Sequence, residues 1–200
     1  MLLFSKPGDA AIRGFLDSQA ALDFTYPAVG ATAGTPPNGW VVDHTRVELG
    51  AGEQSFSAAK QALKQWRQFQ LGWVVPCWPA TPITAGAVVG ILARTLGVWW
   101  LNASRIVYVL DDDEPIARFG FAYGTLPGHV ESGEERFLVE WRRDADSVWY
   151  DILAFSRPRH LLAKVGRPYA RRMQKCFARQ SAEAMIRTAR EHRVEDRDNP

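Results

Sequence analysis

The second half of the chain alternates short apolar segments with polar turns, and this pattern restricts the folds that it can adopt. The segments that connect the apolar runs, such as DDDEP and RDADS, consist of residues that favour turns. Because short polar turns join antiparallel strands, we expect a meander sheet. The expected strands are Gly86–Ala93, Ser104–Leu110, Ile116–Tyr123, Glu135–Trp141 and Val148–Phe155.

A long helix is expected after the last of these strands. Apolar residues between Leu161 and Ala184 recur at the spacing of one helix face, with a break at Gly166–Pro168. A sheet of this kind must bury one face, and the helix is long enough to cover it. The sequence therefore predicts an α+β fold in which an antiparallel meander sheet curves around a long C-terminal helix. Such a helix-grip arrangement often leaves a cavity between helix and sheet.

The first half of the chain supplies fewer elements. We predict an amphipathic helix over Asp9–Leu22, with Asp9 as its N-cap. A strand is predicted over Trp40–Leu49 and a second helix over Glu53–Phe69. Residues 70–82 contain three prolines, so we expect a loop or an edge strand there.

Length and composition fit one soluble domain. The 200 residues suit a single domain, 1–200, with an N-terminal helix and loop in 1–35 and a frayed tail at 193–200. The net charge of +2 produces no strong overall field. Two distant cysteines make neither a disulfide framework nor a zinc pattern. We find no signal peptide, convincing membrane span or motif for a nucleotide, haem or flavin, and expect a cytoplasmic protein without a cofactor.

Two motifs carry a resemblance to known proteins. The segment FAYGTLPGHVESGEERF, together with the upstream YPAVGATAG, resembles a bacterial and plant family of domains of unknown function. The resemblance extends from about Phe15 to Met185. More distantly, the strand order and the helix RPYARRMQKCFARQSAEAM resemble the START-like and polyketide-cyclase superfamily. That second resemblance implies a helix-grip fold, and its members range from lipid carriers to cyclases, so it selects no single activity.

The predicted hairpin around Pro127 gathers the candidate site residues. In a strand, Glu135 shares a face with Phe137 and would lie at the rim of the interior. Tyr123 and Thr125 continue the apolar face of the preceding strand, and His129 lies on the turn above them. A partly desolvated Glu135 is a candidate general acid or base, with His129 as the alternative. The same group of residues could instead anchor a ligand.

A purely structural interpretation of this hairpin remains open. LPGH is typical of a type II turn with Gly128 at positive φ, and Glu131 and Glu134 could be solvated charges. Glu135 could pair across strands with Arg105 or Arg118. Hairpin carboxylates with a single histidine make a poor metal signature, so we expect no metal site.

Two arginines complete the candidate binding residues. Arg105 is a candidate polar anchor in the cavity. In the sequence SRP, Ser156 is a natural N-cap for the last helix, and Arg157 beside it could reach an anionic ligand.

The last helix is strongly basic. Half of the 24 Lys and Arg residues lie between Arg157 and Arg197, and steps of four place Arg167, Arg171, Lys175 and Arg179 on one stripe. The stripe could bind anionic lipid or nucleic acid, but no aromatic residues interleave with it as in single-strand binders, so we do not expect a nucleic-acid partner.

Three functions therefore stay open. The first is a binding protein that holds a small apolar or amphipathic ligand in a cavity between sheet and C-terminal helix, anchored by Tyr123, Thr125, Glu135, Arg105 and Arg157. The second is an enzyme that uses Glu135 or His129 in the same cavity. The third is an anion-surface binder that acts through the last helix.

Overall fold

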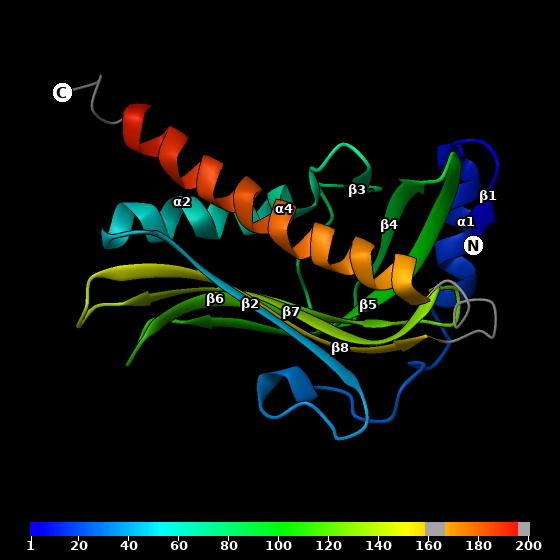
Figure 1. Ribbon diagram of the computed structural model, residues 1–200, viewed down its shortest axis with the longest axis horizontal. Coiled ribbons are helices and arrows are strands. Elements are labelled where there is room, and N and C mark those ends of the chain that lie inside the picture. The colour runs from blue at the N-terminus through cyan, green and yellow to red at the C-terminus, as the bar shows by residue number, and fades with distance from the viewer. Residues whose placement is uncertain (159–166, 196–200) are drawn as a thin grey trace.

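The computed structural model describes residues 1–158 and 167–195 (Figure 1). Its helices are α1 (Asp9–Gln19), α2 (Gly52–Lys64) and α4 (Arg167–Glu195), with short 3-10 helices η1 (Ala31–Ala33) and η2 (Arg67–Phe69). Its strands are β1 (Leu2–Leu3), β2 (Val41–Gly50), β3 (Val74–Pro76), β4 (Val88–Thr95), β5 (Val98–Asp112), β6 (Ala117–Thr125), β7 (Glu131–Arg142) and β8 (Ser147–Pro158). None of the helices in these two ranges combines the length and apolarity needed to cross a membrane.

The strands form one curved antiparallel sheet. Its order is β2-β8-β7-β6-β5-β4-β3, so β3 to β8 follow one another as a meander and β2 adds beside the last strand. The strand β1 pairs with β5 away from this path. Figure 1 shows α4 crossing the concave face of the sheet with α2 beside it. This arrangement confirms the predicted α+β helix-grip fold.

The core lies between the concave face and the two long helices. Phe121, Phe137 and Tyr150 point inward from three neighbouring strands and are fully buried, with Phe69 packed on them from η2. The hydroxyls of Tyr150 and Ser181 lie 2.9 Å apart, which satisfies both groups where α4 meets the sheet. Burial of each large apolar side chain contributes roughly 1.5–3 kcal/mol, so this layer dominates the stability of the fold.

Part of the convex face of the sheet is covered as well. The segment that contains η1 lies on the side opposite α4 (Figure 1). Its Tyr26 hydroxyl donates to Glu134 Oε2 at 2.7 Å, and the Thr32 amide and hydroxyl donate to Oε1 at 2.9 and 2.5 Å. The amide of Gly30 adds a fourth bond, at 2.7 Å. The prediction that Glu134 is a solvated charge is therefore wrong, because the N-terminal segment buries this carboxylate and hydrogen-bonds both of its oxygens.

Several predicted boundaries need correction. The strand β5 starts at Val98 instead of Ser104, since the tryptophans Trp99 and Trp100 pair with β1. The helix α1 has Gly8 as its N-cap, so Asp9 is its first residue. Ser156 belongs to β8, which runs on to Pro158, and does not cap the last helix. The predicted start of that helix at Leu161 lies outside the described residues, as does most of the tail predicted at 193–200.

The turn LPGH exists, but its glycine is needed for a different reason. The amide of His129 donates to the Leu126 carbonyl at 2.9 Å, which closes the turn. Gly128 does not have the positive φ of a type II turn. A Cβ atom on Gly128 would lie 2.4 Å from Phe15 Cζ, so the glycine allows α1 to pack closely on the hairpin.

Gly124→Ala should destabilise the protein strongly. A Cβ atom there would lie 2.0 Å from the Tyr26 hydroxyl, so the substitution should displace Tyr26 and break its bond to Glu134. We expect the free energy of unfolding to fall by about 2–3 kcal/mol, measured by urea denaturation. The control Gly14→Ala, at an exposed position in α1 with nothing near the new methyl group, should leave stability unchanged or raise it by up to about 1 kcal/mol. Equal effects of the two substitutions would contradict the close packing of Tyr26.

Candidate functional site

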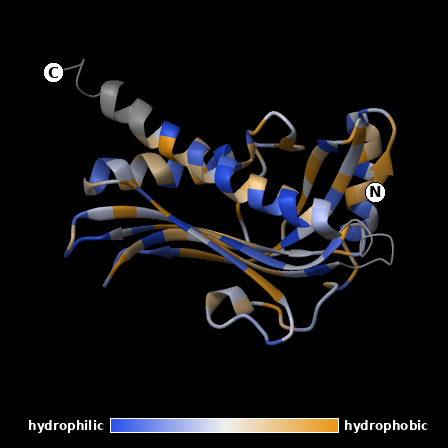
Figure 2. Cartoon of the chain, in the orientation of Figure 1, coloured by the Kyte–Doolittle hydropathy of each residue, from blue (hydrophilic) through white to orange (hydrophobic). Residues whose placement is uncertain are grey.

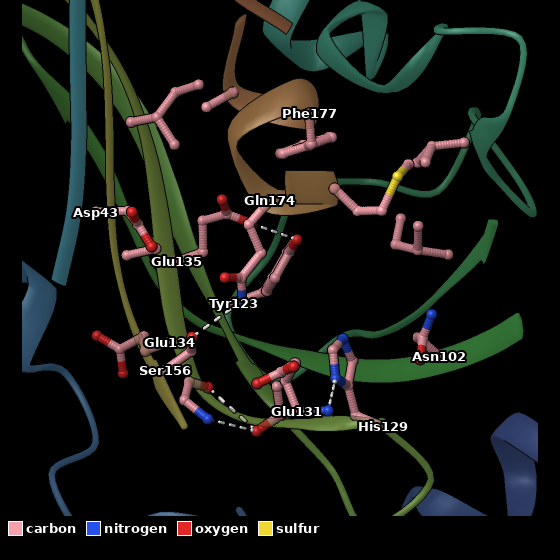
Figure 3. A pocket seen from close by; sticks show the side chains of 18 of the residues that line it. Asp43, Asn102, Tyr123, His129, Glu131, Glu134, Glu135, Ser156, Gln174 and Phe177 are labelled. Atoms are coloured by element: carbon pink, nitrogen blue, oxygen red, sulfur yellow. Dashed lines mark hydrogen bonds between the residues drawn. The ribbon is translucent and has the colours of Figure 1, made fainter. Parts of the chain in front are cut away.

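A cavity of about 230 Å³ lies between the first half of α4 and the concave face of the sheet. Most of its wall is apolar. Side chains from η2, the β3–β4 edge and α4 form this part: Phe69, Trp73, Val74, Ile91, Met173 and Phe177. The polar residues gather at the end formed by β2, β7 and the β6–β7 turn (Figure 3).

Tyr123 and Glu135 form the central polar contact of the cavity. The two residues are paired directly across β6 and β7, and the Tyr123 hydroxyl donates to Glu135 Oε2 at 2.7 Å. Burial raises the pKa of Glu135 to about 7; the hydrogen bond from Tyr123 lowers it, and the negative charge of Asp43 raises it further. Burial and the neighbouring carboxylate also hold the pKa of Tyr123 well above its usual value, so this phenol stays a donor. Glu135 can therefore exchange a proton near neutral pH.

An ion pair connects α4 to the sheet at the same end. The Arg171 guanidinium binds both carboxylate oxygens of Asp43, with its Nη2 2.7 Å from Oδ1. Arg171 also donates to Gln174 at 2.8 Å, and Gln174 in turn donates to the Ser156 hydroxyl at 3.2 Å. This chain of bonds fixes the polar side of α4 over β2 and β8.

His129 and Glu131 form the lower rim of the cavity as drawn in Figure 3. The Glu131 amide donates to Nδ1 of His129 at 3.0 Å, so the histidine is held by the turn itself. The Glu131 side chain is partly buried; burial raises its pKa, and the positive charge of Arg171 opposes that shift. The prediction that Glu131 is a solvated charge is therefore wrong. Among the described residues, no cluster of His, Cys, Asp and Glu is suited to hold a metal ion.

Two other residues that the sequence predicted as ligand anchors form hydrogen bonds within the protein instead. Thr125 lines the cavity, but its hydroxyl is bound by the Gly133 amide at 3.0 Å and by Thr25 at 2.5 Å. Arg105 donates to the carbonyls of Ala20 and Leu22, so it ties the end of the first helix to the sheet and makes no pair with Glu135.

Arg157 also lies away from the position expected for it. It is exposed near the end of β8, where its guanidinium stacks 3.6 Å from the centre of the Trp40 ring. Since β8 continues to Pro158, Arg157 itself lies within a strand and not in the first turn of a helix.

The basic stripe on α4 is partly neutralised. Arg171 is bound to Asp43, and Arg179 lies 3.3 Å from Glu183 one turn further along. Arg171 is therefore less available to an anion, whereas the exposed pair of Arg179 with Glu183 is weak, so anion binding by this stripe stays an alternative.

Sequence reasoning missed Asp43 and Gln174 as cavity residues. The alternation of β2 does place Asp43 on the same face as Thr45 and Val47, which is the inward face. That signal was available in the sequence, whereas the partner of Asp43 lies 128 positions away and has no sequence signature.

The comparisons with known proteins agree with this architecture. A family model described as "Domain of unknown function (DUF1990)" matches residues 25–184. The chain belongs to this family. A UPF0548 protein of Dictyostelium discoideum is 36% identical over 205 residues, which cover 94% of this chain and 95% of that protein. A UPF0548 protein of Arabidopsis thaliana is 37% identical over 153 residues, which cover 75% of this chain and 74% of that protein.

A solved structure shares this fold. The di-domain ARO/CYC StfQ from the steffimycin biosynthetic pathway superposes with a TM-score of 0.51 at 13% identity, over 78% of this chain and 52% of that chain. At this identity the likeness shows the fold alone. The family match confirms the resemblance to a family of domains of unknown function. The shared fold agrees with the helix-grip fold that the second resemblance implied.

Glu135→Gln should change how stability depends on pH. The folded state holds the pKa of Glu135 at about 7, above the ordinary 4.5, so folding favours the protonated acid and wild-type stability is lost as pH rises between these values. The amide cannot ionise, so the variant should be more stable than wild type by about 1–2 kcal/mol at about pH 8, with little difference near about pH 4. Urea denaturation across this range measures the effect. The control Asp144→Asn, at a side chain that is 74% exposed, should give a plot of unfolding free energy against pH that is parallel to that of wild type. A parallel plot for Glu135→Gln would contradict the raised pKa of Glu135.

Proposed function

We propose that the protein binds a small, largely apolar ligand in the cavity beneath α4. The observation that carries the proposal is the cavity itself, about 230 Å³ with mostly apolar walls and a few convergent polar groups. For scale, an apolar cavity of roughly 150 Å³ holds a benzene molecule, so this one has room for a ligand of one or two rings.

The geometry of the walls supports an oriented mode of binding. The ring centres of Phe69 and Phe177 lie 5.1 Å apart with the planes tilted by 37°, and both residues line the cavity. A ligand would bury its apolar part against these rings. Its polar part would face the Tyr123 hydroxyl and the Glu135 carboxylate, which are placed by the register of two strands and not by a loop.

Indole is a suitable probe because it is neutral, apolar and of the right size. We expect indole to bind the wild-type protein and to shift the amide NMR signals of Tyr123, Phe177 and their neighbours. The variant Ala154→Phe places a ring inside the cavity and should weaken binding at least about ten-fold. Native mass spectrometry of the freshly purified protein is a second measurement, which should reveal a co-purified small molecule.

The control Ala85→Phe adds the same ring at an exposed position in the loop before β4 and should leave indole binding unchanged. Shifts spread over the whole surface, or equal binding by wild type and Ala154→Phe, would show that the cavity is not the site.

One observation favours a second candidate function, acid–base catalysis in the same cavity. Glu135 has a pKa of about 7 and holds a hydrogen bond from Tyr123, which suits a group that exchanges protons at neutral pH. His129 lines the same cavity and is the alternative acid–base group. Under this function Glu135→Gln abolishes turnover of a substrate and leaves folding and indole binding intact. A variant that keeps full turnover would remove Glu135 from the mechanism.

A further inference from the structure

The polar end of the cavity is rich in acceptors. Three carboxylates line this end: those of Asp43, Glu131 and Glu135. A carboxylate offers about four lone-pair sites. Glu135 accepts one bond, from Tyr123, and no side chain among residues 1–158 and 167–195 donates a hydrogen bond to the Glu131 carboxylate.

Most hydrogen-bond donors near these carboxylates already bond to other groups of the protein. Arg171 gives its guanidinium to Asp43 and Gln174, and Gln174 gives its amide to Ser156. Trp73 donates its indole N–H to Gln180 at 2.6 Å. The Asn102 side chain accepts from the Val130 amide and keeps a neutral NH₂ group, on the far side of His129 from Glu135 (Figure 3).

Negative charge also exceeds positive charge at this end of the cavity. In the described part of the chain, three carboxylates face one guanidinium, which is bound to Asp43, and the imidazole of His129, whose Nδ1 accepts a hydrogen bond from the Glu131 amide. The groups around Glu135 add no compensating cation: Tyr123 on β6, Asp43 on β2 and Tyr150 on β8 are neutral or negative, and Arg171 on α4 is engaged. The pKa values of Glu131 and Glu135 are both raised, because burial disfavours their ionised forms.

We infer that the polar end of the ligand is a hydrogen-bond-donating cation, such as a protonated amine, held by the carboxylates of Glu131 and Glu135. This inference rests on the proposed ligand-binding function and names the class of ligand. An ammonium group brings several N–H donors and a positive charge to a place that has spare acceptors and spare negative charge. An anionic ligand would meet three carboxylates in a partly buried site and be repelled.

A proton should leave when such a ligand binds. Glu135 is partly protonated at neutral pH in the empty protein, and a cation beside it favours the ionised form. The proton passes from the Glu135 carboxyl group to the buffer. Neutral ligands should release none.

Three probes with the same ring test the inference: benzylamine, benzyl alcohol and benzoate. Titration followed by NMR near about pH 7 should show benzylamine binding at least about ten-fold more tightly than benzoate, with benzyl alcohol between them. Calorimetry in two buffers with different ionisation heats should detect proton release with benzylamine alone. In Glu131→Gln and Glu135→Gln the preference for the amine should shrink, and in Glu135→Gln the proton release should vanish.

The control Glu53→Gln removes an exposed negative charge on α2 and should not change the preference. If benzyl alcohol or benzoate binds as tightly as benzylamine, or if none of the three binds while indole does, the inference is overturned and the apolar cavity stands. If indole fails as well, both the inference and the proposed function are overturned.

Discussion

The contact between α4 and the concave face of the sheet determines the rest of the structure. The two halves of this helix do different things. In the second half Ala182, Met185 and Ala189 are almost fully buried and close the core against the sheet and α2. In the first half Met173 and Phe177 line a space that the sheet does not fill. Figure 2 shows the mixed character of this helix, with hydrophilic and hydrophobic residues both present along its coloured part. One amphipathic element therefore both stabilises the fold and covers the cavity.

Adjacent residues on β7 have opposite roles because a strand presents alternate side chains to its two faces. The Glu134 carboxylate points away from the cavity (Figure 3), into a set of donors that fixes the N-terminal segment on the convex face. Glu135 points into the cavity and has a single donor, Tyr123. Glu134 accepts hydrogen bonds on both oxygens, which suits a structural role. Glu135 accepts only one, so it stays available for a ligand or for proton transfer.

The sequence predicted the features that depend on local periodicity. Alternation along β6 and β7 was enough to place Tyr123, Thr125 and Glu135 on one face, and the helical spacing after residue 160 was enough to predict a covering helix. Contacts between distant segments were not predictable. Nothing near Glu134 in the sequence indicates that Tyr26 and Thr32 bury it, and nothing near Asp43 indicates Arg171. Arg105 was expected to be a polar anchor in the cavity. It binds backbone carbonyls instead, and such partners have no sequence signature.

A crystal structure determined under xenon pressure would test the central claim most directly, namely that α4 spans an open apolar hollow. Xenon enters apolar cavities and is visible as strong electron density. The account predicts a xenon peak in contact with Phe69, Ile91 and Phe177, with α4 lying across the concave face. Side chains that fill this space with no xenon between them, or α4 standing away from the sheet, would contradict it.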